Sequence, residues 1–232
     1  MSFVQRLKDP AFVIRGCHLV WKTSSHEITS AAFDHIWRDF LRDGHNKPDW
    51  HTRLGIAYLM TLEWNKPFFI NNPDQLWKFR NDIEDAFEQT RRKLETLEGL
   101  YLGSASFDLY ADLVKGVYET WSLKPSIRMT GASKLLHFLI PWLFMPWDDA
   151  IRRYYHEECK HTGHQIGDAD CYLEFMRTCN DIAAALLEKC RCKNYRQLAY
   201  LHPAYAARGD IRTIPKMLDE CNYAWITKGL RW

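Results

Sequence analysis

The feature that most restricts the fold of this chain is an apolar residue at every third or fourth position in nearly all of its long segments. The clearest case runs from about residue 74 to residue 98, where a charge-rich segment carries a narrow apolar stripe (Leu76, Phe79, Ile83, Phe87, Leu94 and Leu97). This spacing matches the 3.6-residue turn of an α-helix rather than the alternation of a strand. We therefore predict an all-α protein of about nine or ten helices.

The same spacing, together with capping residues, places the other helices. They are expected near residues 30–44, 49–64, 104–125, 133–140, 150–155 and 168–189, and a last helix begins near Thr213. In the second of these segments the side chains expected to face inward are Leu54, Tyr58, Leu59 and Leu62. Two segments are expected not to be helical. Residues 65–72 are predicted to form a loop, and residues 12–22, rich in β-branched and aromatic side chains, a short strand.

Composition indicates a folded body with a large core. The chain has 232 residues, of which 47% are hydrophobic and 14% aromatic, and both values are too high for a disordered protein. The formal net charge of +2 is too small for a polybasic tail or a membrane-surface protein. We expect residues 1–232 to form a single helical domain, a compact multi-helix bundle that can divide into two lobes around residues 124–155.

The cysteines and the apolar runs bear on location. Seven cysteines, an odd number, and the lack of an apolar stretch in the first ten residues favour a cytoplasmic protein with reduced thiols. The longest apolar run, residues 135–147, is interrupted by His137, Pro141 and Pro146 and is shorter than the ~18 residues that span a membrane. No membrane partner is therefore expected.

The segment from residue 124 to residue 133 has the composition of a phosphate-binding turn. Thr130 and Ser133 can each cap a helix, and Gly131 between them favours a tight turn. The free backbone N–H groups at such a helix start bind anions. Lys124 and Arg128 just upstream would add positive charge to this site.

The next residues carry ionisable groups that have two interpretations. Lys134 and His137 share the face of a helix that the apolar residues leave free, and Asp148 or Asp149 can cap the following helix. On the residues alone, a surface lysine and an ordinary capping aspartate account for this pattern. A catalytic lysine and aspartate are the alternative.

This order of features resembles the helix-hairpin-helix DNA glycosylases. Members of that superfamily have a glycine-rich hairpin, a lysine at the start of the next helix in the bifunctional enzymes, and a catalytic aspartate that opens a D-x-x-[VI]-x-R segment. The sequence DDAIRR matches that segment with Asp148, Ile151 and Arg153, and Lys134 takes the lysine position. The usual hairpin is Gly-x-Gly, whereas this chain has the single glycine Gly131.

The resemblance implies a base-excision DNA glycosylase, with or without lyase activity, acting on a damaged or mispaired base in duplex DNA. Asp148 would stabilise the positive charge that develops on the sugar, and Lys134 would attack C1′ to form a Schiff base. No cofactor is implied. A flipped base needs an aromatic platform, for which the candidates are Trp142, Phe144, Trp147 and the loop at residues 62–69. The residues implied in DNA contact are Lys124, Arg128, Thr130, Gly131, Ser133 and Arg153.

A second function class stays open beside this one, a non-catalytic all-α module that binds nucleic acid or protein. The cluster His156, Cys159, His161 and His164 holds ligand types that zinc prefers, but its spacing fits no standard finger, so no metal is predicted. Walker, Rossmann, H-E-x-x-H and G-x-S-x-G motifs are missing from the sequence. Their absence argues against nucleotide hydrolysis, dinucleotide redox chemistry and serine hydrolysis.

Overall fold

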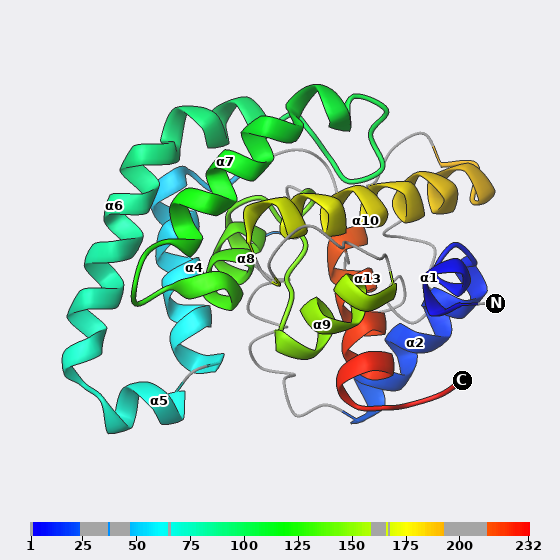
Figure 1. Cartoon of the computed structure of the whole chain (residues 1–232), viewed down its shortest axis with the longest axis horizontal. Helices are drawn as coiled ribbons and strands as arrows, with labels where there is room; N and C mark the ends of the chain where they lie inside the picture. Colours follow the sequence, from blue (N-terminus) through cyan, green and yellow to red (C-terminus); the bar gives the residue numbers. More distant parts are fainter. Residues whose placement is uncertain are drawn as a thin grey trace.

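The structure of the chain is a computed structural model. It describes residues 2–23, 37, 47–64, 66–158, 166, 168–192 and 213–232, with the backbone alone for residues 21–23, 64 and 66–68. Every regular element in this described part is a helix, and ten are α-helices (Figure 1). The prediction of an all-α bundle is confirmed. Of the helix predicted at residues 30–44, only Trp37 lies within the described residues.

The helices form two groups that are joined by one long helix (Figure 1). The first group contains α4 (Trp50–Trp64), α5 (Lys66–Asn71), α6 (Asp74–Leu97), α7 (Ala111–Ser122), α8 (Arg128–Leu139) and the short 3₁₀ helix η1 (Phe107–Tyr110). The second contains α1 (Phe3–Arg6), α2 (Pro10–Thr23), α9 (Asp149–Glu158), α13 (Ile214–Asn222) and the π-helix η2 (Tyr223–Thr227). Helix α10 (Ala169–Lys189) packs against α7 in the first group and α13 in the second.

The predicted strand at residues 12–22 is wrong, because this segment belongs to α2. The buried positions in the helix are 12, 13, 16, 17 and 20, which recur with helical spacing. The β-branched and aromatic content of the segment favours a strand. The helix forms instead because its stripe of buried residues packs against α13.

Two further expectations in the α4–α5 region are corrected. The predicted loop at residues 65–72 contains the helix α5, in which Pro67 lies in the first turn, where the missing N–H costs nothing. In α4, Leu59 is 65% exposed and Arg53 is buried instead. The predicted inward residues Leu54, Tyr58 and Leu62 are partly buried against the core, and the fully buried face of α4 lies beside them. Its residues are Arg53, Ile56, Ala57, Met60 and Thr61.

Capping side chains set the starts of α10 and α13 where the sequence predicts them. Asp168 accepts a hydrogen bond from the N–H of Cys171 at 2.7 Å, and Thr213 accepts one from the N–H of Lys216 at 3.3 Å. Pro215 lies in the first turn of α13, where a proline is tolerated. Within the described residues, no helix has the length and apolar content needed to cross a bilayer.

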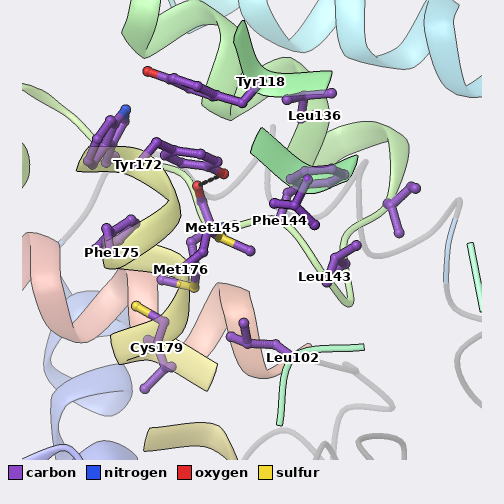
Figure 2. Packing of buried hydrophobic residues seen from close by; sticks show 14 of the residues in the cluster. Leu102, Tyr118, Leu136, Leu143, Phe144, Met145, Tyr172, Phe175, Met176 and Cys179 are labelled. Carbon is purple, nitrogen blue, oxygen red and sulfur yellow. Dashed lines mark hydrogen bonds between the residues drawn. The ribbon is translucent and has the colours of Figure 1, made fainter. Parts of the chain in front are cut away.

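The core contains aromatic and sulfur-bearing side chains from α7, α8 and α10 and from the segment between α8 and α9. Figure 2 shows Phe144 and Met145 of that segment enclosed by residues of these helices. The hydroxyl of Tyr172 in α10 donates to the carbonyl of Met145 at 2.9 Å, and its ring stacks on Tyr118 in α7 with 3.9 Å between centroids. The segment that follows α8 is therefore fixed by the core.

Contact between α2 and the C-terminal segment depends on one glycine. A Cβ at Gly16 would lie 2.4 Å from the ring of Trp232 and 2.7 Å from Sγ of Cys221. The Trp232 ring stacks on Phe12 with 4.9 Å between centroids, and its indole N–H donates to the Phe12 carbonyl at 2.8 Å. Only a residue without a side chain fits at position 16 in this packing.

We therefore expect Gly16→Ala to lower the free energy of unfolding by about 1–3 kcal/mol, because the added methyl group overpacks the contact with Trp232 and Cys221. Gly55→Ala in α4 is the matched control. It meets no atom within 4 Å and should raise the same free energy by up to about 1 kcal/mol through helix propensity. Urea titrations of both variants and the parent measure the difference. A stabilising effect at position 16 would contradict the packing described.

Candidate functional site

The segment predicted to form a hairpin is helical. α8 begins at Arg128, whose φ of 56° is unusual for a residue other than glycine, and it runs without interruption through Thr130, Gly131 and Ser133. The expected turn at residues 130–133, with Thr130 or Ser133 as N-cap, is therefore wrong. The free backbone N–H groups of a helix lie in its first turn. In α8 that turn starts at Arg128, two residues before Thr130.

Ser133 ties α8 to the segment that leads into α9 (Asp149–Glu158). Its buried hydroxyl oxygen accepts a hydrogen bond from the N–H of Trp147 at 3.1 Å, and the hydroxyl donates to the carbonyl of Thr130 at 3.0 Å. Lys134 directly follows Ser133, and Asp148 directly follows Trp147. The hydrogen bond between Ser133 and Trp147 therefore brings together the two backbone segments that carry the candidate catalytic residues.

Both carboxylate oxygens of Asp148 accept hydrogen bonds. Oδ1 accepts from the N–H of Ile151 at 2.8 Å, which is the helix cap that the sequence predicts. Oδ2 accepts from Oγ1 of Thr227 at 2.8 Å. Thr227 is the last residue of η2, a π-helix, and such turns are rare and occur mostly at functional sites. The carboxylate is fixed from two separate elements.

Lys134 is partly buried in α8, and this burial lowers the pKa of its ammonium group. The carboxylates of Asp219 and Asp148 act in the opposite direction, whereas the ammonium group of Lys216 lowers the pKa further. The side chain of Lys134 is thus within electrostatic range of charges from α13 as well as from the start of α9. A lysine amine in such surroundings is more nucleophilic at neutral pH than one in water.

The charged side chains of α13 lie close to one another and to α8. Nζ of Lys216 is 3.2 Å from Oδ2 of Asp219 and 3.9 Å from Oε1 of Glu220, and the exposed fractions of the three side chains are 19%, 18% and 8%. Burial raises the pKa of Asp219, and Lys216 opposes that shift. Lys216 also acts on His137, one turn along α8 from Lys134. We call Lys134, Asp148, Lys216, Asp219 and Glu220 the charged cluster.

The contribution of α13 to this cluster is not predicted from the sequence, which places only a helix beginning near Thr213. A usable signal was present. Lys216, Asp219 and Glu220 lie three and four residues apart and directly beside the apolar positions Met217 and Cys221. Charges that border a buried stripe are partly removed from water, and such groups are found at functional sites more often than exposed ones.

The residues predicted to contact DNA lie in different surroundings. The ammonium group of Lys124 pairs with the carboxylate of Asp85 in α6. Arg153 pairs with Asp149 at 2.9 Å, and Arg128 is exposed and donates to the carbonyl of Pro125 at 3.3 Å. Ser133 is buried, while Thr130 and Gly131 are partly buried within α8. Arg128 and Arg153 are the members of this set that are exposed to solvent.

The three aromatic residues predicted as a base platform are enclosed by protein. Trp142, Phe144 and Trp147 are each at most 2% exposed. The Trp142 indole N–H donates to the carbonyl of Glu98 at 3.1 Å, and the Trp147 ring stacks on Phe175 with 5.2 Å between centroids. A base could stack on these rings only after the packing around them had opened. The remaining candidate, residues 62–69, includes positions whose side chains lie outside the described residues.

Among the described side chains, no three of His, Cys, Asp and Glu converge as a metal site. Of the cluster considered above, Cys159, His161 and His164 lie outside the described residues. Comparisons with protein-family models, with curated proteins and with solved structures find nothing similar to this chain.

Proposed function

We propose that this chain is a DNA-repair-type protein, a base-excision DNA glycosylase that acts on a damaged or mispaired base in duplex DNA. The observation that carries the proposal is the pairing of a partly buried Lys134, whose pKa is lowered, with an oriented Asp148 carboxylate. The segments that carry them are joined by the hydrogen bond between Ser133 and Trp147. The pattern of lysine and aspartate is the one that the resemblance to helix-hairpin-helix glycosylases rests on.

The chemistry divides between the two residues. The amine of Lys134 attacks C1′ of the target nucleotide, the bond from C1′ to the base breaks, and the resulting imine permits strand cleavage. Asp148 supplies a fixed negative charge near the sugar, where positive charge develops as the base departs. If water attacks instead of Lys134, the enzyme excises the base without cleaving the strand.

The proposed setting is the cytoplasm, with thiols kept reduced. The six cysteines in the described part of the chain are all free thiols, and four of them are buried. That arrangement fits a protein which does not depend on disulfides for its fold.

A non-catalytic role in binding nucleic acid or protein is the second candidate. It is favoured by the two hydrogen bonds that occupy Asp148 and by the enclosure of Trp142, Phe144 and Trp147 in the core. In that role the charged cluster would join α8, α9 and α13 and perform no reaction.

Borohydride trapping on a panel of lesion-bearing duplexes separates these candidates. We expect a covalent protein–DNA product that Lys134→Gln abolishes, while Lys115→Gln, a partly exposed lysine in α7, leaves it unchanged. Asp148→Asn should slow base excision roughly 100- to 1000-fold, the scale for loss of one electrostatic stabiliser. Asp149→Asn, which weakens the pairs of an exposed carboxylate with Arg152 and Arg153, should change it little.

Three outcomes would redirect the proposal. Base excision by the parent protein without covalent trapping or strand cleavage identifies a monofunctional enzyme. A larger effect at Asp149 than at Asp148 assigns the catalytic carboxylate to the next residue. A folded protein that excises no base from any lesion in the panel supports the non-catalytic role.

A further inference from the structure

The N-terminal helices and the C-terminal segment share a surface that is rich in basic side chains. Residues 2–20 and 223–232 carry a single acidic side chain, Asp9, and five basic ones (Arg6, Lys8, Arg15, Lys228 and Arg231), which we call the basic surface. α2 packs against both α13 and η2, so the two segments lie side by side. They form the side of the molecule opposite α6 (Figure 1). This side therefore carries an excess of positive charge.

Trp225 in η2 brings two of these cations together. Cζ of Arg6 lies 5.6 Å from the centroid of the Trp225 ring, and Cζ of Arg231 lies 4.1 Å from the same centroid. The ring stacks on Phe3 with 5.0 Å between centroids, which fixes η2 to α1. Nη1 of Arg231 also donates to the carbonyl of Trp225 at 2.8 Å. Two guanidinium groups from opposite ends of the sequence are thus held near each other.

Carboxylates do not neutralise these cations. Within the described residues, Arg6, Lys228 and Arg231 form no ion pair. Glu157 and Glu158, exposed at the end of the neighbouring α9, form none either. A guanidinium group that lies over an aromatic ring keeps the N–H groups at its edge available, and their fork matches the oxygens of a phosphate. Arg231 uses only Nη1 for its bonds to backbone carbonyls, so its other donors can bind a ligand.

The basic surface borders the candidate site. Lys228 is exposed and directly follows Thr227, whose Oγ1 donates to the carboxylate of Asp148 at 2.8 Å. The N–H of Leu230 donates to the carbonyl of Ala224 at 2.9 Å, which turns the chain back along η2. A ligand on the basic surface therefore lies next to the element that holds Asp148.

We propose that Arg6, Lys228 and Arg231 bind phosphate groups of duplex DNA on the side of the protein that adjoins Asp148. The proposal rests on the proposed function in taking DNA as the ligand, and it names the surface that holds the duplex. Charge complementarity favours this ligand, since duplex DNA carries one negative charge per about 1.7 Å of its axis. The surface takes the place of the predicted hairpin at residues 130–133, which is helical.

Binding of an undamaged fluorescent duplex, followed by anisotropy over a range of salt concentrations, tests the proposal. Each lost phosphate contact lowers the slope of log affinity against log salt by about 0.9. Lys228→Gln, which removes one exposed charge, should lower the slope by that amount. The triple variant Arg6→Gln/Lys228→Gln/Arg231→Gln should lower the slope by roughly 2–3 and weaken binding about 100-fold at about 0.1 M salt.

Two further variants separate the basic surface from net charge and from packing. Lys78→Gln/Arg92→Gln/Lys93→Gln removes three exposed charges from α6 and should leave the slope close to that of the parent. Arg6→Lys/Arg231→Lys keeps the two charges while altering the ring contacts of both guanidinium groups, and it should retain most of the slope. Circular dichroism checks that each variant is folded.

A loss of slope confined to the variants that remove charge from the basic surface supports the proposal. Equal losses in the α6 variant, or a parent protein that does not bind the duplex, overturn it. Binding to phosphatidylserine vesicles that depends on these cations, without binding to the duplex, also overturns it and assigns the surface to a membrane. If the slope changes as expected but no lesion is excised, the DNA-binding surface stands and the glycosylase proposal fails. Excision with a slope that the triple variant leaves unchanged keeps the glycosylase proposal and removes this surface from it.

Discussion

Replacing Arg53 by methionine should lower the free energy of unfolding by about 3–5 kcal/mol, the scale for breaking a buried ion pair. Arg53 is 1% exposed and lies in the first turn of α4. Its guanidinium donates to the carbonyls of Pro48 at 2.8 Å and Leu139 at 3.3 Å and pairs with Glu98. Methionine leaves the two carbonyls without this donor and leaves Glu98 paired with Lys47 alone, while keeping much of the side-chain volume. Chemical denaturation monitored by circular dichroism gives the change.

Arg80→Ala is the comparison for this variant. Arg80 pairs with Glu84 one turn along α6, at 2.8 Å, and both side chains are about half exposed. Exposed pairs of this kind contribute little, so the change should stay below about 0.5 kcal/mol. Equal changes in the free energy of unfolding for Arg53→Met and Arg80→Ala would mean that the cost of removing Arg53 from water cancels its attraction to Glu98.

The stability of the protein should fall as the pH drops below about 6.5, in part because of His137. This histidine is 2% exposed and its Nδ1–H donates to the carbonyl of Phe144 at 2.9 Å. Burial lowers its pKa to about 3 in the folded protein, whereas the unfolded chain has the ordinary value of about 6.5. Between these values the unfolded chain binds a proton that the folded protein does not bind. The loss attributable to His137 is about 2.5 kcal/mol between pH 7.5 and 4.5, and it is complete near pH 3.

His137→Asn isolates this contribution. An asparagine side chain can also donate to the Phe144 carbonyl, but it does not titrate. Whatever the stability of the variant at pH 7.5, its free energy of unfolding should decline less toward pH 4.5, by about the amount assigned to His137. Urea midpoints collected across this range provide the measurement. Parallel declines in the parent and the variant would show that other groups cause the acid sensitivity.

Local signals in the sequence account for much of the fold. The caps Asp168 and Thr213 and the apolar stripe of α6 act within a few residues, so the corresponding helices could be predicted. Arg53 could not be placed inside, because its burial depends on Glu98 and Leu139, which lie 45 and 86 residues away. Contacts between residues so far apart in the chain cannot be recognised in a local sequence pattern.

In the candidate site, too, the sequence predicts residues of one local segment and misses those that depend on distant contacts. Lys134 and Asp148 can be predicted as candidate catalytic residues because they belong to one short segment with a recognisable order of residues. Asp219 and Thr227 depend on the docking of a distant segment, and helical periodicity gives the face of that segment without its partner. The aromatic residues between α8 and α9 are predicted as a base platform from their residue type alone. Residue type does not distinguish a tryptophan in the core, such as Trp147, from a tryptophan in a pocket.

The hydrogen bond between Asp148 and Thr227 also has a consequence for how the protein is made. Its two residues are 79 positions apart in the chain. At a synthesis rate of roughly 5–20 residues per second, Asp148 is made about 4–16 s before its partner. During that interval α8 can form, but Lys134 and Asp148 lack the groups from α13 and η2 that surround them later. A ribosome-bound chain that stops short of residue 227 therefore carries both candidate residues without their final electrostatic environment, and the activity proposed here would appear only after that segment has left the exit tunnel.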